Sequence, residues 1–245
     1  MGNTTAKAES FDLHPGRVIG GKYVVDSFLG SGYEGEVYRV VERRTGAMRA
    51  AKVFFPERNE RDRAVSFHAR KLEDLRSCEI VVRYHHSESL TYRGRRVTAM
   101  ISEYVDGPIL RDLVASRPGR RLPEFEALQI LYRLAVGVEE VHVKGEYHGD
   151  IHSGNVLVRR RGVHFDVKLL DLHDHGRSTA SNIQSDVVDM VRMFHEMLGG
   201  RARYRFQSRE IRGIICAMRH SMITRKFPTA RHLREHLDTF GWDES

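Results

Sequence analysis

The chain has 245 residues, a length that fits one large domain or two lobes of about 100–150 residues each. A hydrophobic fraction of 40% allows a substantial core. The two cysteines, Cys78 and Cys216, are too few and too far apart for a disulfide framework or a metal-ligand set. No apolar run is as long as a membrane span, and the N-terminus has no signal-peptide core, so we expect a cytoplasmic protein without a membrane partner.

The formal net charge is +7, and the basic residues are spread along the chain in small clusters. A nucleic-acid interface concentrates such residues on one element, with aromatic residues between them. The spread pattern argues against nucleic acid as a partner. It indicates a solvated basic surface with some affinity for acidic partners.

The first chemical signal is a glycine-rich loop between two strands. Residues 1–18 are polar and lack periodicity, which predicts a flexible tail before a domain at 19–245. Aromatic and β-branched residues predict a strand at 23–29, and Gly30, Gly32 and Gly35 follow in a G-x-G-x-x-G pattern. A dinucleotide site requires a helix directly after these glycines, whereas residues 37–41 predict another strand.

Residues 48–55 predict a third strand, which carries Lys52 among apolar side chains. A lysine in a buried strand is unusual unless it is paired. The alternative is a lysine at the edge of the sheet whose ammonium reaches water. A helix is predicted within 59–77, and two further strands at 81–92 and 96–104.

The second half of the chain is mostly helical in pattern. Residues 123–142 predict an amphipathic helix whose apolar stripe is expected in the core. A polar loop follows, His148–Asn155 (HGDIHSGN), and then a predicted hairpin that Asp171 closes. Oxygen atoms of Asn155 and Asp171 suit Mg²⁺, and a carboxylate near the metal, such as Asp150, can accept a proton from a hydroxyl. The alternative is a hairpin with scattered surface carboxylates.

In this order and spacing, the motifs resemble those of the protein-kinase-like superfamily. HGDIHSGN is similar to the H-x-D-x-x-x-x-N catalytic loop, and Asp171-Leu172-His173 stands where the family has D-F-G. The resemblance covers about residues 20–240. It implies an α+β, bilobal kinase fold. The N-lobe, about 19–103, would have a five-stranded antiparallel sheet and one helix, and the C-lobe, about 107–245, would be mostly helical.

The resemblance also implies ATP and Mg²⁺ as cofactors and assigns a role to each motif. Asp150 would be the general base, with Lys52 and His152 as the other catalytic residues. Asn155 and Asp171 would hold the metal. The nucleotide would be contacted by Gly30, Gly32, Gly35, Val37, Ala50, Lys52, Glu103, Val105 and Leu157.

Two departures from the family pattern bear on catalysis. The helix that normally supplies a glutamate to pair with the strand lysine has His68 at that position, and Glu73 lies more than one turn further on. Either His68 replaces the glutamate, or the helix is set differently and Glu73 serves; Asp74 is a third choice. The DLH sequence in place of DFG is the other departure.

Three functions remain open. The first is a protein Ser/Thr kinase, whose protein substrate would bind through a folded surface or a docking site, because only a short segment separates Asp171 from the helix that begins near Asp186. The second is a small-molecule kinase, because an H-G-D-x-H-x-G-N loop is similar to that of aminoglycoside- and choline-type phosphotransferases. The third is a nucleotide-binding pseudokinase, which the missing helix glutamate favours.

Overall fold

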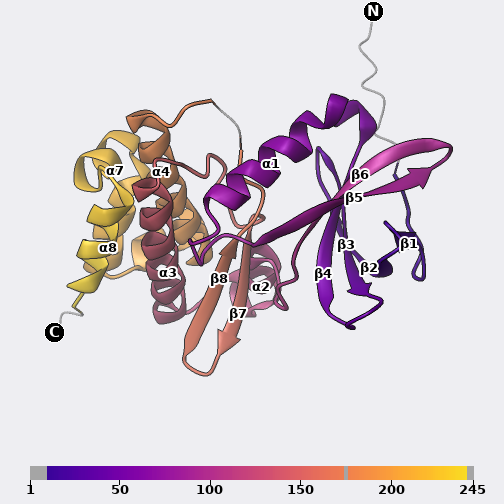
Figure 1. Ribbon diagram of the computed structural model, residues 1–245. Coiled ribbons are helices and arrows are strands. Elements are labelled where there is room, and N and C mark those ends of the chain that lie inside the picture. Colours follow the sequence, from indigo (N-terminus) through magenta and orange to yellow (C-terminus); the bar gives the residue numbers. More distant parts are fainter. Residues whose placement is uncertain (1–9, 174–175, 242–245) are drawn as a thin grey trace, which may run out of the picture. The chain divides into compact units, whose positions relative to one another are not determined.

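The computed structural model describes residues 10–173 and 176–241, and the chain forms two compact units (Figure 1). The first unit contains the residues up to Arg76 together with Val82–Tyr104. The second contains Ser77–Val81 and the residues from Val105 onward. The main division between the units lies between Tyr104 and Val105.

A six-stranded antiparallel sheet forms the first unit, with the strand order β1-β2-β3-β4-β6-β5. The strands are β1 (Val18–Ile19), β2 (Tyr23–Ser31), β3 (Gly35–Glu42), β4 (Met48–Phe54), β5 (Tyr84–Tyr92) and β6 (Arg95–Glu103). The predicted five-stranded sheet was one strand short. The additional strand, β1, is two residues long and pairs with β2, and a strand of two residues has no alternating pattern that a sequence could reveal.

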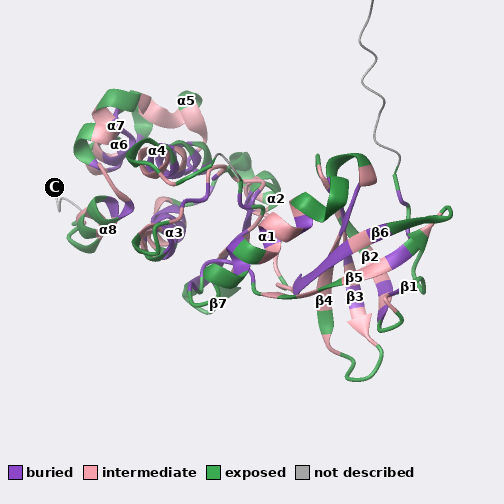
Figure 2. Cartoon of the chain, turned by 45° about the horizontal axis from the view of Figure 1, so that its top comes forward, coloured by how far each residue is buried: buried purple, intermediate pink, exposed green. Residues whose placement is uncertain are grey.

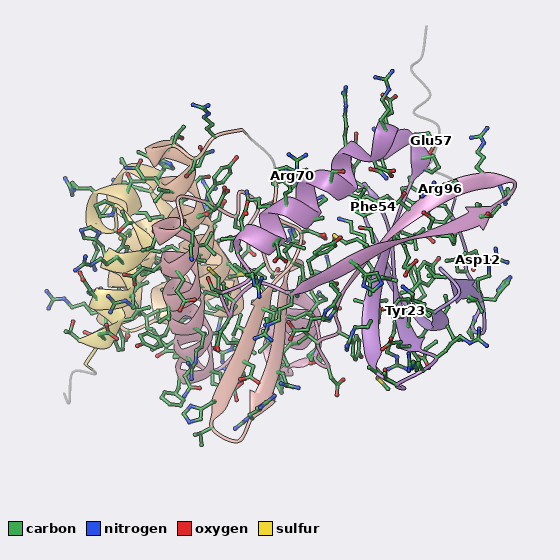
Figure 3. All side chains as sticks on the ribbon, in the orientation of Figure 1. Asp12, Tyr23, Phe54, Glu57, Arg70 and Arg96 are labelled. Atoms are coloured by element: carbon green, nitrogen blue, oxygen red, sulfur yellow. The ribbon has the colours of Figure 1, made fainter. Side chains whose placement is uncertain are left out.

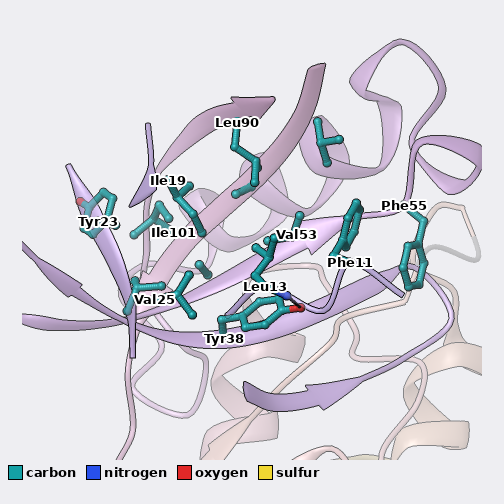
Figure 4. Close-up of a cluster of buried hydrophobic side chains, with 14 residues drawn as sticks. Phe11, Leu13, Ile19, Tyr23, Val25, Tyr38, Val53, Phe55, Leu90 and Ile101 are labelled. Carbon is teal, nitrogen blue, oxygen red and sulfur yellow. Dashed lines mark hydrogen bonds between the residues drawn. The ribbon is translucent and has the colours of Figure 1, made fainter. Parts of the chain in front are cut away.

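The segment that precedes β1 packs on this sheet. Phe11 and Leu13 are buried in the cluster shown in Figure 4, where Phe11 stacks on Phe55 at 5.2 Å between ring centroids. The buried carboxylate of Glu36 accepts hydrogen bonds from Ser10 Oγ at 2.7 Å and from the backbone N–H of Phe11 at 3.2 Å. Residues 10–18, which the sequence placed in a tail, therefore belong to the packed domain; residues 1–9 lie outside the described residues.

One α-helix, α1 (Arg63–Asp74), belongs to the part of the first unit that the structure describes. Its buried side chains include Val65, His68 and Leu72. The His68 ring packs against Phe54 of β4, with 5.9 Å between ring centroids, and Figure 3 labels Phe54 beside this helix. The helix begins at Arg63, inside the predicted range 59–77 but after its first residues. Arg61 and Asp62 have positive φ angles of 52° and 58°, and this backbone conformation ends any helical run before Arg63.

The second unit is built on helices and one hairpin. The helices are α2 (Leu110–Ser116), α3 (Glu124–Val143), α4 (Ala180–Met197), α5 (Gly200–Arg203), α6 (Arg209–Ile215), α7 (His220–Lys226) and α8 (Ala230–Asp238). The hairpin pairs β7 (Val156–Arg161) with β8 (His164–Leu169). Buried residues line α3 and α4 (Figure 2), including the predicted α3 stripe of Leu128, Leu131, Ala135 and Val138. None of the described helices is long and apolar enough to cross a membrane.

Candidate functional site

The glycine hairpin joins β2 to β3, and its three glycines serve different purposes. A Cβ atom at Gly35 would overlap the carbonyl oxygen of Val53, so the close approach of β3 and β4 requires glycine there. A Cβ atom at Gly30 or Gly32 would meet nothing within 4 Å. The backbone at these two positions is open on the side where a side chain would stand, which is the property that a phosphate-covering loop needs.

Lys52 is paired with a carboxylate from the glycine hairpin itself. Its Nζ atom donates to Oε2 of Glu34 at 2.7 Å, and the side chain of Lys52 is only 11% exposed. Nε2 of His68, a buried residue of α1, lies 2.8 Å from the same oxygen. Glu34 therefore joins the strand lysine to the helix position where the family has glutamate.

This arrangement corrects the expectation for the helix. His68 contacts Glu34, and Glu34 supplies the carboxylate that was expected from a residue of α1. Glu73 is exposed and pairs with Arg76 at 3.0 Å, so it has a surface partner three residues away. The signal for Glu34 was present in the sequence as an acidic residue inside the glycine motif, but only the fold of the hairpin directs it toward Lys52.

The environment keeps the Glu34 carboxyl ionised. Burial alone would raise its pKa, but the hydrogen bond from His68 and the charge and hydrogen bond of Lys52 outweigh burial and lower the pKa to about 2. A carboxylate with a lowered pKa stabilises the fold at pH values above its ordinary range. That contribution is lost as the pH falls from 4.5 toward 2.

We therefore expect the free energy of unfolding of Glu34→Gln to depend less on pH below pH 4.5 than that of the wild type. The free energy of unfolding of the wild type should fall by roughly 2 kcal/mol more than that of the variant between pH 4.5 and pH 2, since one pKa unit corresponds to about 1.4 kcal/mol. Urea titrations at several pH values measure this difference. Glu73→Gln, which changes an exposed carboxylate, is the control, and equal acid profiles for all three proteins would contradict the Glu34 pairing.

The predicted adenine contacts of the first unit lie on neighbouring strands. Val37 of β3 pairs with Lys52 of β4, and Ala50 of β4 pairs with Ser102 of β6. Val37 and Ala50 are both half-buried. The backbone N–H of Glu103 donates to the Arg83 carbonyl at 2.8 Å, so this N–H is used within the sheet.

In the second unit, Asp186 of α4 fixes the backbone of the predicted catalytic loop, His148–Asn155. Its carboxylate is fully buried and accepts the backbone N–H groups of His148 and Gly149, each at 2.8 Å. Nε2 of His142, near the end of α3, lies 3.0 Å from the same carboxylate. A buried carboxylate with three polar neighbours is held firmly, so it sets the position of the loop relative to α3 and α4.

The Asp150 carboxylate lies at the centre of the loop's polar groups. Asn155 Nδ2 donates to Asp150 Oδ2 and to the Asp150 carbonyl oxygen, both at 3.1 Å. His152 Nε2 is 3.4 Å from the same Oδ2, and His173 Nε2 is 4.0 Å from it. The side chain remains 41% exposed, so Asp150 is oriented by its neighbours and still accessible to a substrate hydroxyl.

His148 connects the loop to the end of the hairpin. Its Nε2 donates to the Leu170 carbonyl at 2.8 Å, and its Nδ1 accepts the Asp150 backbone N–H at 3.2 Å. One neutral tautomer satisfies both bonds. The backbone N–H of Leu170 donates to the Asn155 carbonyl at 2.8 Å, so the loop and the segment that carries Asp171 are held together at two points.

The two predicted metal ligands differ in exposure. Asn155 is buried, and because its Nδ2 is directed at Asp150, its Oδ1 is left as the ligand atom. Asp171 lies two residues beyond β8, is exposed, and has a φ of 52° in the left-handed region, while the next residue, Leu172, is buried. An amide oxygen and a carboxylate are a fitting donor set for Mg²⁺. Within residues 10–173 and 176–241, no three His, Cys, Asp or Glu side chains cluster as a closed metal site.

The remaining predicted nucleotide contacts also lie in the second unit. Leu157 of β7 is half-buried, pairs with Lys168 and forms a bridge to Ile109. Val105 is half-buried at the start of the unit. The segment after Asp171 is short, because Thr179 already caps α4: its Oγ1 accepts the Asn182 backbone N–H at 3.2 Å.

A sheet with a glycine hairpin and a half-buried, paired lysine, followed by a helical unit with an Asp–Asn loop, is the arrangement of a phosphotransferase class of fold. A family model described as protein kinase domain matches residues 23–211. The chain belongs to the protein kinase domain family. The crystal structure of a double mutant of the PknI kinase domain from Mycobacterium tuberculosis has a TM-score of 0.64 at 18% identity, and the match covers 92% of this chain and 98% of that chain.

Curated relatives are similar over part of the chain. CBL-interacting protein kinase 30 of Oryza sativa is 32% identical over 157 residues, which are 63% of this chain and 31% of that protein. "Probable serine/threonine-protein kinase SCO3848" of Streptomyces coelicolor is 32% identical over 161 residues, 63% of this chain and 23% of that protein. The match thus spans less than a third of the length of these relatives.

Proposed function

We propose that the chain is a Mg-ATP-dependent protein kinase that phosphorylates Ser or Thr. The observation that carries the proposal is the position of Asp150: it is oriented by Asn155 and His152, its loop is anchored to the buried Asp186, and it is still accessible. The names of the relatives, which include serine/threonine-protein kinases, support a protein hydroxyl as the acceptor.

Four charged or polar side chains have separate tasks in the transfer step. Asp150 accepts the proton of the acceptor hydroxyl. His152, whose Nε2 lies 3.4 Å from the Asp150 carboxylate, orients that carboxylate before transfer. Lys52 neutralises phosphate charge, and Glu34 orients the ammonium group.

The remaining residues of the proposal would hold the nucleotide and the metal. Asn155 Oδ1 and Asp171 would hold Mg²⁺, which supplies charge neutralisation on the phosphates. The open backbone at Gly30 and Gly32 would cover the phosphates. The adenine would be contacted by Val37, Ala50, Glu103, Val105 and Leu157.

The deciding experiment is incubation with γ-labelled ATP and Mg²⁺, with generic protein acceptors in one arm and amino-sugar or choline acceptors in the other. Label on a protein, including the enzyme itself, is the expected result. Label on the small molecules would replace the proposal with the small-molecule kinase. Nucleotide binding without any transfer would identify a pseudokinase.

Asp171→Ala should abolish most of the stabilisation by Mg-ATP and leave the fold intact, because the side chain is exposed. A ligand at 100 times its Kd stabilises by about 2.7 kcal/mol, which for a chain of this size is roughly 5–10 °C in Tm. A thermal-shift titration measures it. The control is Asp112→Ala, which removes an exposed carboxylate on α2. If Mg-ATP raised the Tm of Asp171→Ala as much as that of the wild type, Asp171 would not be a metal ligand.

A further inference from the structure

A cavity lies in the helical unit, and none of its lining residues belongs to the loop His148–Asn155. Its volume is about 610 Å³. It is lined by His195 from the end of α4, by Arg201 from α5, by Tyr204 and Arg205 directly after α5, and by Ala217 and Met218 from the turn before α7. Cavities of this size accommodate a ligand as large as a few amino-acid residues.

The cavity carries positive charge that the described residues do not neutralise. Neither Arg201 nor Arg205 has an acidic partner within residues 10–173 and 176–241, and none of the lining residues is acidic. Arg234 of the same unit differs, because it pairs with Glu139 at 2.5 Å. The guanidinium group of Arg205 lies over the Phe206 ring, 4.7 Å from its centroid, where its N–H groups have no acidic partner among the described residues. Guanidinium groups of this kind are suited to a carboxylate or a phosphate, which they bind through two parallel hydrogen bonds.

His195 adds an unused polar group at the cavity wall. The residue is only 9% exposed, and its ring packs edge-on against Tyr204 with 5.7 Å between centroids. Among the described residues its ring nitrogens have no hydrogen-bond partner, yet they are not among the side-chain atoms closed off from solvent, so they face the cavity. Burial lowers the pKa of His195, so the imidazole is neutral near pH 7 and offers one donor and one acceptor.

A strained turn contributes part of the cavity wall. Cys216, Ala217 and Met218 have positive φ angles of 50°, 52° and 58° in succession, although none is glycine. Each such residue costs on the order of 1–3 kcal/mol and persists only where the surrounding structure holds it, as it does at many ligand sites. The turn buries Cys216 and presents Ala217 and Met218 to the cavity, which gives the site an apolar part beside its charged part.

We propose that this cavity is a docking site for an acidic segment of a protein partner, with a carboxylate on Arg201 and Arg205 and an adjacent apolar side chain against Tyr204 and Met218. The identification of this partner as the phosphorylation substrate rests on the proposed function. The binding of an acidic segment in the cavity is independent of the proposed function. The size of the cavity and its apolar wall distinguish such a segment from a free anion. A remote docking site also suits a chain whose segment between Asp171 and α4 is short.

Binding is tested directly with the full chain and a fluorescein-labelled peptide that has four glutamates around one leucine, by fluorescence anisotropy. The Arg201→Glu/Arg205→Glu variant should weaken binding tenfold or more, since two favourable charge contacts become repulsive. His195→Phe, which keeps the ring contact with Tyr204, should weaken it about threefold through the loss of a hydrogen bond. The matched control is Arg133→Glu/Arg225→Glu, which makes the same change in net charge at exposed positions elsewhere in the unit.

Three results would overturn the docking site. The first is an equal loss of peptide binding in the control variant, and the second is no loss in either variant. The third is that inorganic phosphate displaces the labelled peptide at the same concentration as the unlabelled peptide does. Catalysis supplies the second arm, with dephosphorylated casein as an acidic acceptor and myelin basic protein as a basic one. The arginine variant should raise KM for casein about tenfold and leave kcat and the reaction with the basic protein unchanged. Arginine-dependent peptide binding without any phosphate transfer would preserve the docking site and reject the proposed function.

Discussion

Asp150→Asn is expected to lower kcat by about 10²–10⁴-fold, the usual cost of losing a general base, while nucleotide binding survives. An asparagine side chain has nearly the size of aspartate but cannot take up the hydroxyl proton. Its amide oxygen can still accept the hydrogen bond that Asn155 Nδ2 gives to Asp150 Oδ2, so the loop should keep its conformation. Single-turnover transfer of label from ATP measures the chemical step, and a thermal-shift titration with Mg-ATP measures binding.

The control for this substitution is Asp166→Asn, on β8 of the adjacent hairpin. Asp166 is a half-exposed carboxylate that pairs with Arg159 at 3.1 Å and with Arg161 at 2.6 Å, so its loss tests charge and local stability without touching the loop. Turnover of the Asp150 variant within a few-fold of the control would place the proton acceptor elsewhere. Loss of both transfer and nucleotide binding would indicate that the loop itself had changed.

The sequence predicted the parts of this fold that depend on local pattern. Runs of aromatic, β-branched and other apolar residues predicted β2, β3 and β4, and helical spacing predicted the core stripe of α3. The resemblance of the loop His148–Asn155 to a catalytic loop could be recognised because the motif has its residue types at fixed spacings. These features are encoded within windows of a few residues, which is why they can be read without the fold.

The features that the sequence missed depend on partners far along the chain. Ser10 and Phe11 donate hydrogen bonds to Glu36, about 25 residues further along the chain. No local sequence pattern predicts that this polar stretch binds a buried carboxylate so far away. Glu34 is the same case: it is 18 residues from Lys52 and 34 from His68, and its role follows from the turn of the hairpin. The cavity beside His195 depends on three left-handed residues whose identities do not suggest that conformation.

Glu34→Gln is expected to lower kcat/KM by about 10²-fold, because Lys52 loses the charged partner that orients it and small displacements of a positioning group cost this much. The fold should persist at pH 7, since glutamine keeps the shape of the side chain and can still accept a hydrogen bond. The informative companion is Glu34→Gln combined with His68→Glu, which moves the carboxylate from the glycine hairpin to α1.

Lys52 Nζ and His68 Nε2 lie 2.7 Å and 2.8 Å from the same oxygen of Glu34, so a carboxylate at position 68 starts from a side chain already directed at the lysine's partner. We expect the double variant to recover most of the lost kcat/KM, because a carboxylate would again be available to replace the contact between Glu34 and Lys52. Glu73→Ala is the control and should change little, since Glu73 is exposed and bound to Arg76. Full activity in Glu34→Gln alone would show that Lys52 does not need the Glu34 carboxylate. An inactive, folded double variant would show that Glu34 acts on the nucleotide through the hairpin and not through Lys52.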